Sequence, residues 1–159
     1  MEKTLIIAKP DAVQRGLVGE IISRFEHKGL KLIGMKMINV SGVLLRAHYA
    51  HIAEKPFYQD VEDFMQSSPV VAMAWEGYAC TDAVRILVGP TNSREAPAGT
   101  VRGDFGMAMG RNIIHASDSP ENGANEVSRF FEENELFEYN KTEWLHVYEH
   151  KELPDYDSN

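Results

Sequence analysis

Residues 110 to 119 form the stretch Gly110-Arg111-Asn112-Ile113-Ile114-His115-Ala116-Ser117-Asp118-Ser119. The apolar pair Ile113-Ile114 follows a region rich in Gly, Pro, Thr, Asn and Arg, so Asn112–His115 is predicted to be a short strand. Ser119-Pro120 then predicts a helix start, with serine as the N-cap and proline in the first turn. The stretch therefore places one histidine, His115, at the end of a strand and just before a helix.

Three further segments predict strands upstream of this stretch, two as apolar runs and the middle one as an alternating segment rich in Ile and Met. They cover Thr4–Ala8, residues 31–40 and Val70–Trp75, and the third reads as a central strand because it is apolar throughout. Pro10 is expected to end the first of them. The region between Gly89 and Gly110 shows no periodicity, and a loop of that length in a compact domain is usually functional.

Apolar positions at helical spacing predict helices between the strands. The first helix has Val18, Ile21, Ile22 and Phe25 on one face and stops at Gly29. Three others are expected around Leu44, Leu45, His48 and Ile52, around Val61, Phe64 and Met65, and around Ala83, Val84, Ile86 and Leu87. A final helix, which follows Ser119-Pro120, has Val127, Phe130 and Phe131 on its apolar face. The order βαββαβ with extra helices predicts an α+β fold, with helices over an antiparallel sheet.

Composition bounds the class of protein. The chain has 159 residues, 43% of them hydrophobic and 25% charged, with no linker or repeat, so one domain spanning 1–159 is expected. No apolar run approaches the ~20 residues of a membrane span, and the first apolar run is too short for a signal peptide. The single cysteine, Cys80, suits a reducing cytoplasm, and the net charge of −8 disfavours nucleic acid as a main partner.

The candidate chemical residues are weak when each is taken alone. A lysine after a strand, an arginine on a helix or a lone histidine is more often structural or solvated than functional. The chain has no Walker A, GxGxxG, HExxH or GxSxG motif. Among six histidines, His48 and His51 have helical spacing. No carboxylate cluster lies beside them in the sequence, so we interpret both as surface residues rather than metal ligands.

Three segments together resemble the nucleoside diphosphate kinases: Lys9 to Gly16, Arg102-Gly103-Asp104-Phe105, and above all Gly110 to Ser119 with its N-x-x-H-[GA]-S-D pattern. The similarity runs from Lys3 to about Glu149. It implies a ferredoxin-like βαββαβ core with a long loop and a C-terminal extension. It also implies transfer of the γ-phosphate of a nucleoside triphosphate to a nucleoside diphosphate, with low base specificity. Such a reaction balances nucleotide pools.

The resemblance also assigns roles by position. It implies catalytic roles for His115, Lys9, Glu126 and Ser117, with His115 carrying the phosphoryl group in a ping-pong mechanism. The nucleotide-binding positions it implies are Lys9, Tyr49, Phe57, Arg85, Thr91, Arg102, Met109 and Asn112. Phe57 matches the aromatic residue that stacks on the base. Mg²⁺ is expected to arrive with the nucleotide, and no protein metal site is expected.

Assembly and the alternative function stay open at this level. The resemblance favours a homohexamer, but Ser93 and Ala98 stand where the family usually has proline, which leaves a tetramer or dimer possible. The apolar residues between Leu136 and Tyr148 are too many for a solvated linker, whereas residues 150–159 look like a flexible polar tail. The alternative function is a catalytically weak scaffold or regulatory protein on the same fold.

Overall fold

The computed structural model describes residues 1–153 and contains one four-stranded antiparallel sheet in the order β2-β3-β1-β4. The strands are β1 (Glu2–Ala8), β2 (Lys31–Ile38), β3 (Val70–Gly77) and β4 (Ile114–Ala116). β1 and β3 lie in the middle and pair over their whole length, from Glu2 opposite Gly77 to Ala8 opposite Val71. The predicted α+β fold is confirmed, and β3 is a central strand, as its continuous apolar sequence predicts.

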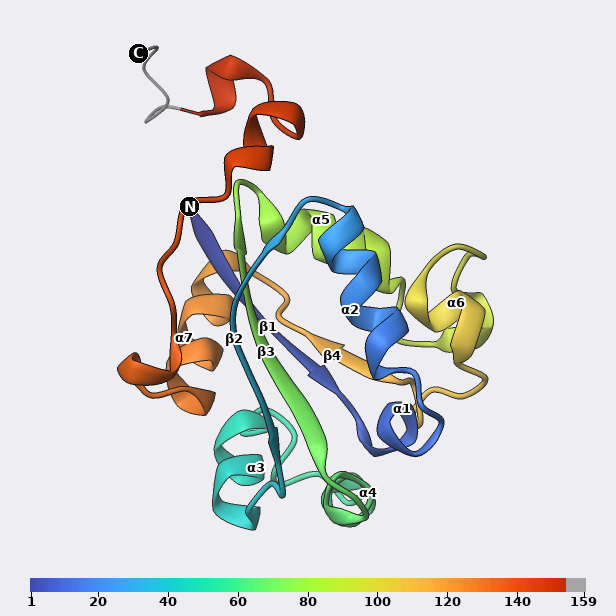
Figure 1. Cartoon of the computed structure of the whole chain (residues 1–159). Helices are drawn as coiled ribbons and strands as arrows, with labels where there is room; N and C mark the ends of the chain where they lie inside the picture. Colours follow the sequence, from blue (N-terminus) through green and yellow to red (C-terminus); the bar gives the residue numbers. More distant parts are fainter. Residues whose placement is uncertain (154–159) are drawn as a thin grey trace.

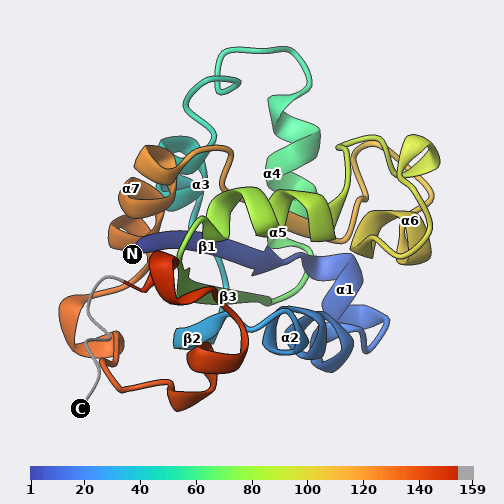
Figure 2. The same cartoon turned by 90° about the horizontal axis from the view of Figure 1, so that it is seen from above.

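Helices cover both faces of this sheet (Figures 1 and 2). One face carries α1 (Pro10–Gln14), α2 (Val18–His27), α5 (Cys80–Val88) and α6 (Val101–Phe105), and the other carries α3 (Gly42–His48), α4 (Tyr58–Gln66) and α7 (Pro120–Phe130). β1 supplies both cores, because its side chains alternate between the two faces. Ile6 packs with the first group of helices, whereas Leu5 and Ile7 pack with the second.

Helix α7 lies unusually close to β1. A Cβ atom added to Gly123 would lie 2.3 Å from the carbonyl oxygen of Lys3, so only glycine fits at this crossing. Ser119 accepts a hydrogen bond from the backbone N–H of Asn122 and is followed by proline, which confirms the predicted helix start. This close crossing brings the inner face of α7 next to the strand that carries His115.

Three local differences from the sequence expectations surround the site. Pro10 does end β1, but it also begins α1, because a proline is tolerated in the first turn of a helix. The expected strand Asn112–His115 is shifted to Ile114–Ala116, since Ile113 has a left-handed φ of 73° that no strand accepts. The aperiodic loop contains a 3₁₀ turn at Ser93–Glu95 and α6, whose N-cap is Thr100.

The chain after α7 runs back along β2 and then over the end of the sheet (Figure 1). As far as Leu153 it forms three 3₁₀ turns, Glu133–Glu135, Thr142–His146 and His150–Glu152. The backbone N–H of Phe137 donates to the carbonyl oxygen of Ile33, and Trp144 Nε1 donates to that of Gly29 at 3.0 Å. Within the expected tail, His150–Glu152 forms the last of these turns and Leu153 is buried. The rest of that predicted tail, residues 154–159, lies outside the described residues.

Among the helices of residues 1–153, none has the length and apolar character that a membrane crossing demands.

Candidate active site

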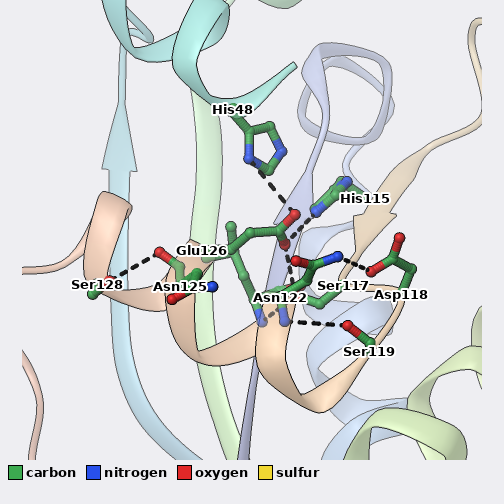
Figure 3. A network of polar contacts seen from close by, with 10 residues as sticks. His48, His115, Ser117, Asp118, Ser119, Asn122, Asn125, Glu126 and Ser128 are labelled. Atoms are coloured by element: carbon green, nitrogen blue, oxygen red, sulfur yellow. Dashed lines mark hydrogen bonds and ion pairs between the residues drawn. The ribbon is translucent and has the colours of Figure 1, made fainter. Parts of the chain in front are cut away.

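His115 lies on β4 and faces helix α7 (Figure 3). Its Nε2 lies 2.8 Å from Oε2 of Glu126, which comes from the middle of α7. The two side chains are 18% and 14% exposed, so the contact is partly shielded from water. An ionised carboxylate has no proton to donate and can only accept a hydrogen bond. The proton in this contact is therefore on Nε2 of the ring. The lone pair of the neutral ring is therefore on Nδ1.

Ser117 holds the Glu126 carboxylate in place. Ser117 is fully buried, and its Oγ donates to Oε2 of Glu126 at 2.6 Å while accepting from the backbone N–H of Leu5 at 3.0 Å. Burial raises the pKa of Glu126, but the hydrogen bond and charge of His115 and the bond from Ser117 outweigh it and bring that pKa to about 2. Glu126 is thus an anion across the physiological pH range.

His48 lies next to the other oxygen atom of the Glu126 carboxylate. Its Nδ1 is 3.9 Å from Oε1 of Glu126, and its ring stands edge-on to that of His115 with the centroids 4.4 Å apart. The side chain is 1% exposed, and burial together with the charge of His115 lowers its pKa to about 3. The expectation that His48 is a surface residue is wrong, because α3 turns it inward beside Leu45, whereas His51 is exposed as expected.

A cavity of about 600 Å³ opens next to these residues, between α4 and the loop before β4. It contains six of the expected nucleotide-binding residues: Lys9, Tyr49, Phe57, Thr91, Met109 and Asn112. Its volume lies within the ~300–1,000 Å³ of typical small-molecule sites. Phe57 and Met109 are 51% and 65% exposed, so two apolar side chains are free to meet a flat ligand. The Tyr49 ring lies 6.4 Å from that of His115 and joins the cavity to the His115 site.

A chain of polar contacts crosses the inner end of this cavity. Lys9 Nζ donates to Oδ1 of Asn112 at 2.7 Å, and Asn112 Nδ2 donates to the carbonyl oxygen of Thr91 at 3.0 Å. Burial and the charge of Arg102 lower the pKa of Lys9 to about 8. A nucleotide phosphate here would meet a cation whose attraction is strengthened by low local polarity.

The two expected arginines, Arg102 and Arg85, lie in different environments. Arg102 is buried, and its guanidinium donates to the carbonyl oxygens of Gly89, Asn112 and Ile114. Burial and the charge of Arg85 lower the pKa of Arg102 to about 10, so it remains a cation at neutral pH. Arg85 is exposed on α5 and does not line the 600 Å³ cavity. The structure therefore brings Arg102 against the backbone of the site and leaves Arg85 at its margin.

One residue that sequence reasoning gave no role organises the loop before β4. Oδ2 of Asp11 accepts the backbone N–H of Ile113 at 3.0 Å, and the N–H of Lys9 donates to the carbonyl oxygen of Ile113. These bonds hold the left-handed backbone of Ile113, which a β-branched residue rarely adopts. Asp11 belongs to the Lys9–Gly16 segment, so the signal was present in the sequence, but its partner 102 residues away was not visible there.

Comparison with known proteins identifies the family. The family model described as nucleoside diphosphate kinase matches residues 2–136. The nucleoside diphosphate kinase of Parabacteroides distasonis is 51% identical over 153 residues, which cover 96% of this chain and all of that protein. The enzyme of the same name from Carboxydothermus hydrogenoformans is 50% identical over 149 residues, covering 94% of this chain and all of that protein.

Solved structures agree. A halophilic nucleoside diphosphate kinase from Halobacterium salinarum in complex with CDP superposes with a TM-score of 0.90 at 42% identity, covering 93% of this chain and 99% of that one. A nucleoside diphosphate kinase family protein from Babesia bovis gives 0.90 at 44% identity, covering 93% of this chain and all of that one. With the fold, the family model and near full-length relatives in agreement, this chain is an enzyme that transfers phosphate between nucleotides and belongs to the nucleoside diphosphate kinase family.

Proposed function

We propose that Nδ1 of His115 is the atom that carries the phosphoryl group in a ping-pong reaction. The observation behind this proposal is the 2.8 Å contact between Nε2 of His115 and Oε2 of Glu126. A neutral imidazole has one N–H and one lone pair, so a carboxylate that accepts from Nε2 leaves the lone pair on Nδ1. The serine bond to the same oxygen fixes the direction from which Glu126 approaches.

The reaction then consists of two matched half-reactions. Nδ1 attacks the γ-phosphorus of a nucleoside triphosphate, the bond from that phosphorus to the β–γ bridging oxygen breaks, and a nucleoside diphosphate leaves. A second diphosphate reverses the step with its terminal oxygen and regenerates the lone pair on Nδ1. During phosphorylation the ring gains positive character, which the anionic Glu126 stabilises. One site serves both halves, because donor and product are the same kind of molecule.

The 600 Å³ cavity is the proposed nucleotide site. Phe57 and Met109 would hold the base between apolar side chains, and every base offers a π face to such contacts, so low base specificity is expected. Lys9 and Asn112 would bind the sugar and phosphates at the inner end, where Thr91 and the Tyr49 hydroxyl add hydrogen-bonding groups. In this proposal the phosphates point toward His115 and the base points outward.

Arginine charge is the second component of phosphate binding. Arg102 already donates hydrogen bonds to three carbonyl oxygens, so its role combines holding the loop with a positive field at the site. Arg85 would reach the terminal phosphate by a side-chain movement, since it lies outside the cavity in this structure. These cations supply locally what a chain of net charge −8 lacks overall.

The residues around the cavity fit a magnesium ion that is bound to the nucleotide rather than to the protein. Across residues 1–153, one group of three histidine, cysteine, aspartate or glutamate side chains lies close enough to share an ion, and it contains two imidazoles. Mg²⁺ prefers six oxygen ligands and usually binds through substrate phosphates and water. The ion would neutralise phosphate charge, while Lys9 and Asn112 orient the nucleotide that brings it.

We further propose that the enzyme is a homohexamer that works in the cytoplasm to balance nucleotide pools. Support for assembly comes from apolar side chains that the described chain leaves uncovered. Met35 and Met37 on the edge strand β2 are 52% and 61% exposed, and Phe137 on the C-terminal extension is 65% exposed. Light scattering on a sizing column tests this proposal: a stable tetramer or dimer would support the alternative that the altered loop residues weaken the hexamer.

Phosphorylation of the protein itself tests the mechanism. Incubation with γ-labelled triphosphate is expected to give a label that survives base and is lost in acid, as a phosphohistidine does. A diphosphate added afterwards should remove the label and appear as triphosphate. A chain that takes up no label would support the alternative, a catalytically weak scaffold or regulatory protein on this fold.

A further inference from the structure

We propose that His48, His115 and Glu126 form a binding site for a transition-metal divalent cation such as Zn²⁺, and that the bound ion blocks phosphoryl transfer. The Glu126 carboxylate faces both imidazoles, with Oε2 2.8 Å from Nε2 of His115 and Oε1 3.9 Å from Nδ1 of His48 (Figure 3). One ligand atom from each of the three residues lies within 4.8 Å of the others. Two histidines and one glutamate are a ligand set that zinc uses in catalytic sites.

His48 is the residue that points to a ligand. Its side chain is 1% exposed, and neither ring nitrogen has a hydrogen-bond partner anywhere in residues 1–153. A buried polar group without a partner costs free energy, and such groups in native proteins usually have an explanation. The proposed reaction at His115 makes no use of either nitrogen. Coordination of an ion through Nδ1 would satisfy the nitrogen that faces Glu126.

An ion can reach these ligands without entering the nucleotide cavity. A second cavity of about 750 Å³ lies between α3 and α7 and includes His48, Glu126 and Asp118 among its lining residues. It shares no lining residue with the Phe57 cavity. The chemistry of the donors selects Zn²⁺, Co²⁺, Ni²⁺ or Cu²⁺ over Mg²⁺, because imidazole nitrogen is a poor ligand for magnesium.

Binding would inactivate His115 through its tautomer. When the ion takes the Nε2 lone pair, the proton from Nε2 moves to Nδ1, so the ring stays neutral and no net proton is released. Nδ1 is then an N–H and has no lone pair with which to attack phosphorus. This consequence rests on the proposed function, whereas the binding of the ion does not.

The binding test uses the full chain without an affinity tag, stripped of metal and free of nucleotide. Titration calorimetry with Zn²⁺ is expected to show one ion per chain, and Co²⁺ should give the visible absorption of a nitrogen-containing site. His48→Gln and Glu126→Gln are expected to lower the Zn²⁺ affinity by at least about tenfold. His51→Gln is the matched control, because His51 lines the same cavity but is exposed and lies outside the ligand set.

Two further measurements make the result decisive. Thermal unfolding of the metal-free variants checks that they fold, and Zn²⁺ should raise the midpoint of the wild type and of His51→Gln but not of His48→Gln. If the His48 variant does not fold, Glu126→Gln and His115→Asn answer the same question. Equal Zn²⁺ affinity in the wild type and in the ligand variants would overturn the site.

Activity separates this proposal from the proposed function. At constant magnesium nucleotide, Zn²⁺ should inhibit transfer by the wild type and by His51→Gln, while any activity of His48→Gln should respond to Zn²⁺ only at higher concentration. Zn²⁺ that binds at the three ligands without inhibiting would overturn the tautomer argument and, with it, Nδ1 as the nucleophile. Absence of phosphohistidine would reject the proposed function and leave the calorimetric result standing.

Discussion

Oε2 of Glu126 lies 2.8 Å from Nε2 of His115 and accepts the hydroxyl of Ser117 at 2.6 Å. The contact joins the shortest strand of the sheet to the inner face of α7. Because the carboxylate is ionised, it acts on the histidine without competing for its proton. In the proposed mechanism, this one side chain determines which imidazole nitrogen is available for chemistry and stabilises the charge that develops on the ring.

His115→Ala is expected to abolish phosphate transfer and to leave the fold intact. His115 is partly exposed at the edge of the sheet, so the core loses little packing, whereas the reaction loses its proposed nucleophile. Loss of the acid-labile label and unchanged circular dichroism check the two halves of this prediction. Transfer at even about a tenth of the wild-type rate would contradict the ping-pong mechanism.

Glu126→Gln is expected to lower kcat by at least about tenfold while changing KM little. A glutamine can still bond to the ring, but it no longer specifies the proton on Nε2 and offers no negative charge. Steady-state kinetics separates the two parameters. Ser117→Ala is the milder comparison, because it leaves the carboxylate in place and removes one of its bonds. A raised KM with unchanged kcat would place Glu126 in substrate binding instead.

Phe57→Ala is expected to weaken nucleotide binding by about 1–3 kcal/mol, the usual size of a stacking loss. Phe57 is half exposed at the cavity, so truncation should not affect folding. Calorimetry with adenine, guanine, cytosine and uracil diphosphates measures the loss for each base. Similar losses for all four bases are expected, and a loss confined to one base would contradict the argument for low specificity.

Acid should destabilise the protein through His48. Its pKa falls from 6.5 in the unfolded chain to about 3 in the folded one, so between these values the unfolded state binds one more proton. The free energy of unfolding must then decrease as pH falls from 6.5 toward 3, with a slope of up to about 1.4 kcal/mol per pH unit from this group. Glu126 adds a loss in the same direction, but only below its ordinary pKa of 4.5.

The window from pH 4.5 to 6.5 therefore isolates His48 from Glu126. Urea unfolding at several pH values across this window measures the slope. His48→Phe is expected to remove part of it, because the variant has no ring nitrogen to protonate in either state. His51→Phe, a change at an exposed position of the next turn, should retain the slope. Identical slopes in the wild type and in His48→Phe would contradict the assignment.

Trp144→Ala is expected to destabilise the protein by about 3 kcal/mol or more and to loosen the C-terminal extension. Trp144 is 6% exposed, donates to Gly29 and packs against Tyr78 and Tyr148 with ring centroids 5.7 and 5.8 Å away. Truncation of the C-terminal extension just before Trp144 should lower stability further, as measured by thermal unfolding. Leu145→Ala, at a neighbouring position that is 40% exposed, is the control and should change stability little.

The local signals of the sequence were sufficient for the long strands, for the long helices and for the family. β1 and β3 contain continuous apolar runs at residues 5–8 and 70–75, α2 has apolar residues at helical spacing, and Ser119-Pro120 marks the start of α7. These patterns depend on neighbours within a few residues, so they can be read without knowing the rest of the fold. The segment from Asn112 to Asp118 did the same for the family, because its residues are adjacent in the chain.

The tertiary structure alone decided which distant residues share an environment. His48 has apolar neighbours on one face of α3, yet only the packing of α3 against α7 showed that it is buried against His115 and Glu126. The left-handed backbone of Ile113 depends on Asp11, which is 102 residues away. Such contacts are set by how helices cross a sheet rather than by local propensity. Sequence determined what each segment is, and packing determined what each polar side chain meets.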